Sequence, residues 1–112
     1  MKYILFTLLT TCATPPVHTD HPAPAGDRER AFLDDNDRAM TRMMDAMMIR
    51  PHGDVDADFV AMMSPHHRGA VDMAMLELRY GHNEQLRRLA QEIIVTQEDE
   101  IRAMALAIGD AK

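Results

Sequence analysis

A histidine pair and several methionines lie within a few helical turns of each other between residues 62 and 75. In a helix, residues three, four and seven positions apart share one face. Met63, His66, Ala70 and Met73 therefore form one stripe if this segment is helical, and the small Ala70 leaves room beside the stripe. Neutral imidazole and thioether are both good ligands for soft metal ions, Cu(I) in particular. The stripe predicts a site for such an ion.

A second group of methionines precedes the first and falls within nine residues: Met40, Met43, Met44, Met47 and Met48. The whole chain has eleven methionines but only three Phe, two Tyr and no Trp. Methionine at helical spacing commonly packs in a core, because it has nearly the helix propensity of leucine and fills irregular gaps. For this group alone, metal ligation is no more strongly indicated than core packing.

The paired histidines favour the ligand interpretation, because their methionine and alanine neighbours offer an imidazole almost no hydrogen-bond partners. Adjacent helical residues point about 100° apart. We therefore expect one histidine to be a ligand and the other to support it, or each to serve a different site. His66 is the first choice. The full set of candidate metal ligands is Met40, Met43, Met44, Met47, Met63, His66, His67 and Met73.

Residues 1–13 have one lysine, a short apolar run and then small residues, which is typical of an export signal. Residues 9–12 also resemble a bacterial lipobox, so Cys12 is a candidate lipid anchor, although Thr11 departs from the usual small residue there. Residues 14–26 hold four prolines and are expected to form a disordered linker to a helical domain at 27–112. Cys12 is the sole cysteine, so this domain has no thiolate ligand, and thioethers suit an oxidising compartment. We expect a periplasmic or secreted protein.

Three helices are expected, and no strand signal is present. The first runs from residue 27 to 50, where Pro51 and Gly53 end it. The second runs from about 56 to 80, capped by Asp54 or Asp56. Pro65 either kinks this helix or breaks it, with Ser64 as the cap of a restarted helix.

The third helix is expected to run from an Asn83 cap to about residue 108, with Gly109 beyond it. Its apolar stripe is the expected core contribution and consists of Leu86, Leu89, Ala90, Ile93, Met104 and Ile108. Gln97 interrupts this stripe and needs polar partners if it is buried. We expect it either to bond a neighbouring helix or to support a ligand.

Charge and motifs exclude several function classes. The formal net charge of −6 argues against binding of nucleic acid or of an anionic membrane surface. Di-iron enzymes of helical bundles need Glu-x-x-His motifs, and zinc hydrolases carry His-Glu-x-x-His; the sequence has neither. We therefore expect no enzyme. Membrane attachment is expected only through lipid at Cys12.

Residues 63–74, Met-Ser-Pro-His-His-Arg-Gly-Ala-Val-Asp-Met-Ala, resemble the signature of a bacterial secreted family called domain of unknown function 305. The flanking segments at 56–59 and 97–104 also resemble that family, and the similarity covers roughly residues 32–108. The resemblance implies a ferritin-like, all-α, up-down helical bundle and an exported location. Through CopM-like members it also implies binding of copper or silver by Met and His, here by Met63, His66, His67 and Met73.

The sequence thus predicts an exported protein that binds Cu(I), with Ag(I) as a second cargo, and buffers it or passes it to a copper-handling partner protein. The alternative is a non-enzymatic interaction module. Three helices make a thin core, so the chain could form a homodimer or grip a partner helix in a methionine-rich groove.

Overall fold

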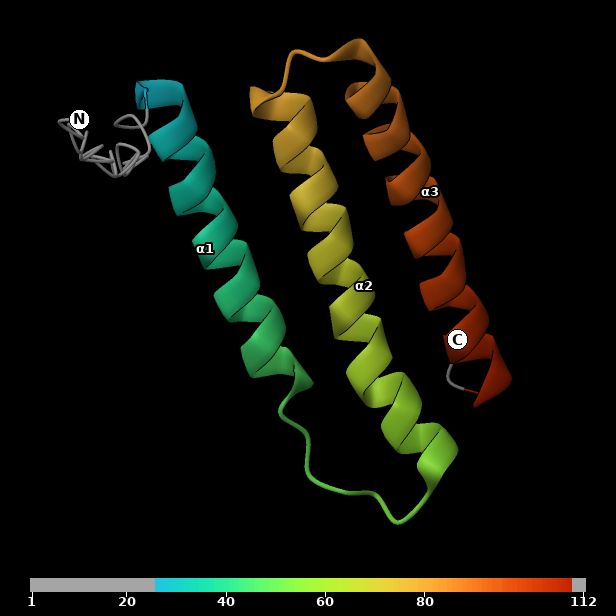
Figure 1. Cartoon of the computed structure of the whole chain (residues 1–112). Coiled ribbons are helices and arrows are strands. Elements are labelled where there is room, and N and C mark those ends of the chain that lie inside the picture. Colours follow the sequence, from blue (N-terminus) through green and yellow to red (C-terminus); the bar gives the residue numbers. More distant parts are fainter. Residues whose placement is uncertain (1–25, 110–112) are drawn as a thin grey trace, which may run out of the picture.

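The computed structural model describes residues 26–109, which form three helices connected in an up-down-up order (Figure 1). Helix α1 spans Asp27–Met47, α2 spans Val55–Tyr80 and α3 spans Glu84–Ala107. No strand occurs within residues 26–109. The expected all-α, up-down architecture is confirmed. The expected export signal, Cys12 anchor and nearly all of the proline-rich linker lie outside the described residues.

The helix boundaries follow the capping residues in the sequence. The Asp54 side chain accepts a hydrogen bond from the amide of Asp56 at 3.2 Å, and Asn83 accepts bonds from two amides at the start of α3. Helix α1 ends at Met47, three residues before the expected end. Arg50 precedes Pro51, which disfavours the helical conformation at that position, and Gly53 then takes a positive φ of 83° in the loop.

Pro65 lies inside α2, which runs without a break from Val55 to Tyr80. The restart with Ser64 as a cap is therefore wrong. Proline lacks the amide that would bond the carbonyl of residue 61, but the rest of the helix tolerates this loss. Both histidines consequently lie in the middle of a helix rather than in a first turn.

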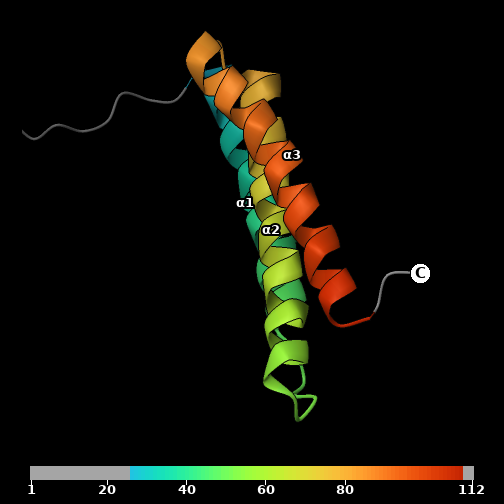
Figure 2. The same cartoon turned by 90° about the vertical axis from the view of Figure 1, so that its right-hand side faces the viewer.

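The three helices form a single layer with α2 in the middle. Helices α1 and α3 each pack against α2 and, within the described residues, do not contact each other. The second view shows this layer edge on (Figure 2). A layer of this kind has two broad faces and no closed centre.

Small residues bring the helices together. Ala39, Ala74 and Ala90 are the buried apolar side chains of the described part, and Gly69 is buried with them. A Cβ atom at Gly69 would come within 2.7 Å of Cγ and 3.0 Å of Cβ of Met43, so glycine lets α1 approach α2 at this point.

The apolar stripe of α3 is not the closed core that its spacing predicts. Ala90 is buried, but Leu86 and Leu89 are about half exposed and Ile108 is also exposed. The reason is geometric: the stripe packs only partly against α2, and no described element covers the remainder. Among the described residues, no large side chain is fully buried.

Polar side chains connect neighbouring helices at several levels. Tyr80 donates a hydrogen bond to Asp35 of α1 at 2.5 Å, and Arg42 of α1 lies 3.3 Å from Asp72 of α2. At the turn between α2 and α3, Arg87 donates to the carbonyl oxygens of Leu78 and Gly81. The arginine thereby satisfies carbonyls that the end of α2 leaves free.

Candidate metal site on one face of the helical layer

One face of the layer is polar. Its grooves between α1 and α2 have volumes of about 390 and 230 Å³ and share Arg42 and Asp72. We call it the arginine face; it is formed by Asp35, Arg38, Arg42, Arg68, Asp72, Met75 and Arg79. A 2.5 Å hydrogen bond from Tyr80, and then the bond from Arg38, lower the pKa of Asp35 below its ordinary value of 3.8. The Arg38–Asp35 and Arg42–Asp72 ion pairs keep this face charged and solvated.

The opposite face is apolar and rich in sulfur. Its groove between α2 and α3, of about 320 Å³, is lined almost entirely by apolar side chains, with Met73 and Leu89 among them. We call it the thioether face; it is formed by Leu33, Met40, Met44 and Met47 of α1, Phe59, Met62, His66 and Met73 of α2, and Leu86, Leu89 and Ile93 of α3.

Helical geometry assigns α1 methionines to this face. Ala39 is the residue of α1 buried against α2. Counting 100° per residue, Arg42 lies about 60° to one side of Ala39, and Met47, Met40 and Met44 lie about 80–140° to the other side. Arg42 lines the grooves of the arginine face, so the three methionines belong to the other one.

The same counting places His66 at the centre of the thioether face. On α2, Gly69 faces α1 and Ala74 faces α3. His66 lies about halfway between these two directions, and Met73 lies within about 20° of His66. The predicted stripe of α2 therefore exists and points out of the layer.

His66 and His67 occupy different environments, although their ring centroids are only 6.0 Å apart. His66 is exposed, and within residues 26–109 no hydrogen bond engages its ring nitrogens. The side chain of His67 is only 14% exposed and extends toward α3. The structure thus separates two residues that the sequence presents as a pair.

Both ring nitrogens of His67 face acceptors. Its Nδ1 lies 2.9 Å from the carbonyl oxygen of Met63, and its Nε2 lies 2.8 Å from a carboxylate oxygen of Glu100. Protein atoms therefore engage both nitrogens of this ring, in contrast to those of His66. His67 in this arrangement joins α2 to α3.

Gln97 belongs to the same group of polar residues. Its side-chain amide donates to Glu100 at 3.3 Å, on the oxygen that also accepts from His67. This bond lies within α3, so within the described part the structure shows neither a bond from Gln97 to a neighbouring helix nor its contact with a metal ligand. The Glu100 carboxylate is the functional partner that sequence reasoning missed, because it lies 33 positions from His67 and appeared only as part of an acidic run.

The register of the helices shows which thioethers share a level with His66. Helices α1 and α2 are antiparallel, and Met43 packs at Gly69. With 1.5 Å of rise per residue in each helix, Met47 lies level with residues 65 and 66. Three residues before Met43, Met40 lies level with residues 72 and 73. At two heights along the helix axes, a methionine of α1 therefore lies level with a candidate ligand of α2: Met47 with His66, and Met40 with Met73.

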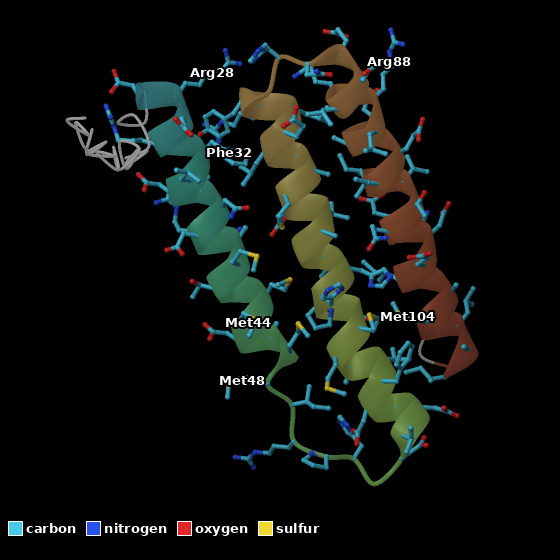
Figure 3. All side chains as sticks on the ribbon, in the orientation of Figure 1. Arg28, Phe32, Met44, Met48, Arg88 and Met104 are labelled. Atoms are coloured by element: carbon cyan, nitrogen blue, oxygen red, sulfur yellow. The ribbon has the colours of Figure 1, made fainter. Side chains whose placement is uncertain are left out.

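The remaining methionines are distributed more widely. Figure 3 shows sulfur atoms between α1 and α2 and shows Met104 extending from α3 toward α2. The bond between His67 and Glu100 sets the register of α2 and α3, which brings Met63 level with Met104. Met43 lies in the contact with Gly69, whereas Met48 lies beyond the end of α1 and is highly exposed.

The structure places Met62 and Met75 at positions that the methionine spacing alone does not predict. Met62 is exposed on the thioether face and extends the candidate set; its helical spacing to His66, four residues, was the available signal. Met75 lines a groove of the arginine face instead. Met73 and Met75 are 43% and 56% exposed on opposite sides of one helix, which makes them a matched pair for experiments.

Within the described residues, no three or more His, Cys, Asp or Glu side chains gather where they could hold a metal ion. Zinc and the harder ions rely on such groups. On the thioether face, the exposed donor atoms include thioether sulfurs and the His66 ring nitrogens. Nor is any helix of residues 26–109 sufficiently long and apolar to span a bilayer.

Comparison with known proteins adds a family assignment. No curated protein matches the chain. The family model described as "Domain of unknown function (DUF305)" matches residues 5–108, nearly the whole sequence. This match agrees with the signature at residues 63–74 and with the three-helix, strand-free architecture of the described part. The chain belongs to the DUF305 family.

Proposed function

We propose that this protein binds Cu(I), and Ag(I) as a chemically similar ion, through thioethers and His66 on the thioether face. The observation that carries the proposal is the placement of His66. It is exposed, its ring nitrogens are unengaged within residues 26–109, and its helix face is shared with Met62 and Met73. Thioether and neutral imidazole select soft monovalent ions over hard ones.

The proposed ligand set consists of side chains that lie at the same height along the axes of α1 and α2. Met47 of α1 is level with His66, and Met62 lies one turn from it on the same face of α2. A second, all-thioether level combines Met40 with Met73. Because methionine side chains are long and flexible, sulfur atoms on neighbouring helices can converge on one ion with little backbone movement. His67 orients the helices through Glu100 rather than binding the metal.

The proposed biological role is that of a metal buffer or carrier in an exported compartment, without enzymatic activity. Thioethers cannot form disulfides, so an oxidising compartment does not remove them as ligands in the way that it removes thiolates. An exposed face also permits direct transfer of the ion to a copper-handling partner protein. The proposal includes the predicted export signal, and the exported protein is either free or anchored through lipid at Cys12.

A titration with Cu(I) under reducing conditions, against a chromophoric competitor, tests the proposal. Met73→Leu keeps the helix propensity and apolar volume but removes the sulfur. We expect it to weaken Cu(I) binding several-fold, and Met75→Leu to leave it unchanged. Absence of competition by the wild-type protein would refute the proposal, as would equal affinities of the two variants.

A second candidate function rests on a different observation, the half-exposed apolar side chains of the thioether face. Leu33, Phe59, Leu86 and Leu89 are each close to 50% exposed. An exposed apolar area of this kind marks an interaction surface. An interaction surface on this face is compatible with metal binding on the same face.

A further inference from the structure

The thioether face lacks a covering layer. Helices bury their apolar stripes against a second layer in stable domains, yet within residues 26–109 only small residues are buried and α1 does not reach α3. The charged side chains of the arginine face between α1 and α2 are solvated, whereas its groove between α2 and α3, of about 470 Å³, has apolar lining such as Val60 and Ile101. The thioether face is the side on which exposed apolar side chains come from all three helices, so it is the side that calls for an apolar partner.

The dimensions of the face indicate the kind of partner. The 24 residues of α3 give a length of roughly 36 Å, and three helices spaced 8–10 Å apart give a width of about 20 Å. The resulting area, on the order of 700 Å², is close to the roughly 800 Å² that each partner buries in a stable interface. A single helix, about 10 Å wide, would cover only half of it.

For the residues that precede α1, the sequence predicts an export signal at 1–13 and a linker at 14–26 rather than a second layer of helices. Twenty-five residues precede Gly26, and four prolines fall between positions 15 and 24. Proline-rich segments of this kind favour extended conformations over helices. A second copy of the three-helix layer has the required length, breadth and apolar surface.

We infer that the thioether face is covered by the same face of a second copy of this chain. Such a pairing of identical surfaces has twofold symmetry. The middle helix of one layer then lies over the middle helix of the other. His66 and Ala70 flank the midpoint of α2, so the axis passes near them, and the small Ala70 permits close approach.

This arrangement adds to the proposed function, on which the following step rests. A twofold axis near the middle of α2 brings two His66 side chains toward each other, with thioethers from both copies around them. The second copy thereby completes the ligand shell. The first Cu(I) ion is expected to bind at one ion per two chains.

Light scattering coupled to size exclusion, on the full chain in metal-free buffer, tests the dimer independently of copper. We expect twice the chain mass of 12.7 kDa and a melting temperature that rises with protein concentration. A helical protein with the mass of one chain at tens of micromolar would overturn the inference. It would leave the apolar face open or covered by the chain's own residues.

Two charge substitutions locate the interface. Leu89 on the thioether face and Met75 on the arginine face are similarly exposed, at 49% and 56%. Leu89→Glu should yield monomers, and Met75→Glu should stay dimeric. The opposite pattern, or two dimeric variants, would overturn the assignment. The concentration dependence of wild-type melting decides the matter if Leu89→Glu does not fold.

The copper stoichiometry separates the two proposals. A dimer that ignores Cu(I) refutes the metal function and leaves the association intact. A dimer whose first ion binds at one per chain overturns the shared site at the axis. A half-equivalent end point in the competition titration, lost in His66→Ala while the mass stays doubled, supports both.

Discussion

The different positions of His66 and His67 give the sharpest prediction for stability. His67→Ala removes the hydrogen bond to the Met63 carbonyl and the bond to Glu100. The first contributes about 1 kcal/mol net. The second contributes about 0.5–1 kcal/mol, because the Glu100 side chain is half exposed. Alanine's higher helix propensity returns roughly 0.5 kcal/mol. Lost packing of the ring adds about 1 kcal/mol.

The expected net destabilisation for His67→Ala is therefore about 2–2.5 kcal/mol. His66→Ala removes a ring that makes no hydrogen bond within residues 26–109 and that faces its own copy at the proposed dimer axis, so its effect should stay below about 0.5 kcal/mol in either direction. Copper affinity should show the opposite order, with a large loss for His66→Ala and a small one for His67→Ala.

Urea unfolding followed by circular dichroism, in metal-free buffer at one fixed protein concentration, measures these differences. With a slope near 1–1.5 kcal/mol/M, His67→Ala should lower the midpoint by about 1.3–2.5 M. Equal midpoints for the two variants, or a larger loss for His66→Ala, would refute the assignment of His67 as the link between α2 and α3.

Three further perturbations test the packing. Gly69→Ala should destabilise by about 1 kcal/mol in urea unfolding, because overpacking against Met43 costs more than helix propensity returns; a more stable variant would contradict the close contact. Asn36→Leu should raise the free energy of unfolding by about 1 kcal/mol, since the buried Asn36 Oδ1 has no described hydrogen-bond partner; a clear loss would show that the oxygen is satisfied. The amide and then the imidazole of His52 lower the pKa of Asp58 below 3.8. Asp58→Asn should therefore destabilise at neutral pH, and the difference from wild type should fade as the pH falls below 3.8 through the folded-state pKa. A difference that persists at pH 2 would contradict this.

The sequence predicts the helices well because local signals define them. Asn83 and Asp54 cap as expected, and Gly53 supplies a positive φ after α1. The open layer was beyond sequence reasoning, since a stripe such as Leu86 and Leu89 shows that a face is apolar but not what covers it. Whether a proline interrupts a helix depends likewise on the packing around it.

The candidate site was likewise predictable only in part. Helical spacing was sufficient to predict that His66 and Met73 share a face. The distinct role of His67 was not predictable, because it depends on Glu100, which reaches His67 only through the packing of α3 on α2. The opposite orientation of Met75 likewise depends on where α1 and α3 lie around α2.

X-ray absorption spectroscopy at the copper edge, on the purified chain loaded with a half equivalent of Cu(I), tests the central claim most directly. We predict a first coordination shell that contains sulfur together with nitrogen, and loss of the sulfur contribution when the methionines of the thioether face are changed to leucine. A shell of nitrogen and oxygen alone would contradict metal binding by the thioether face.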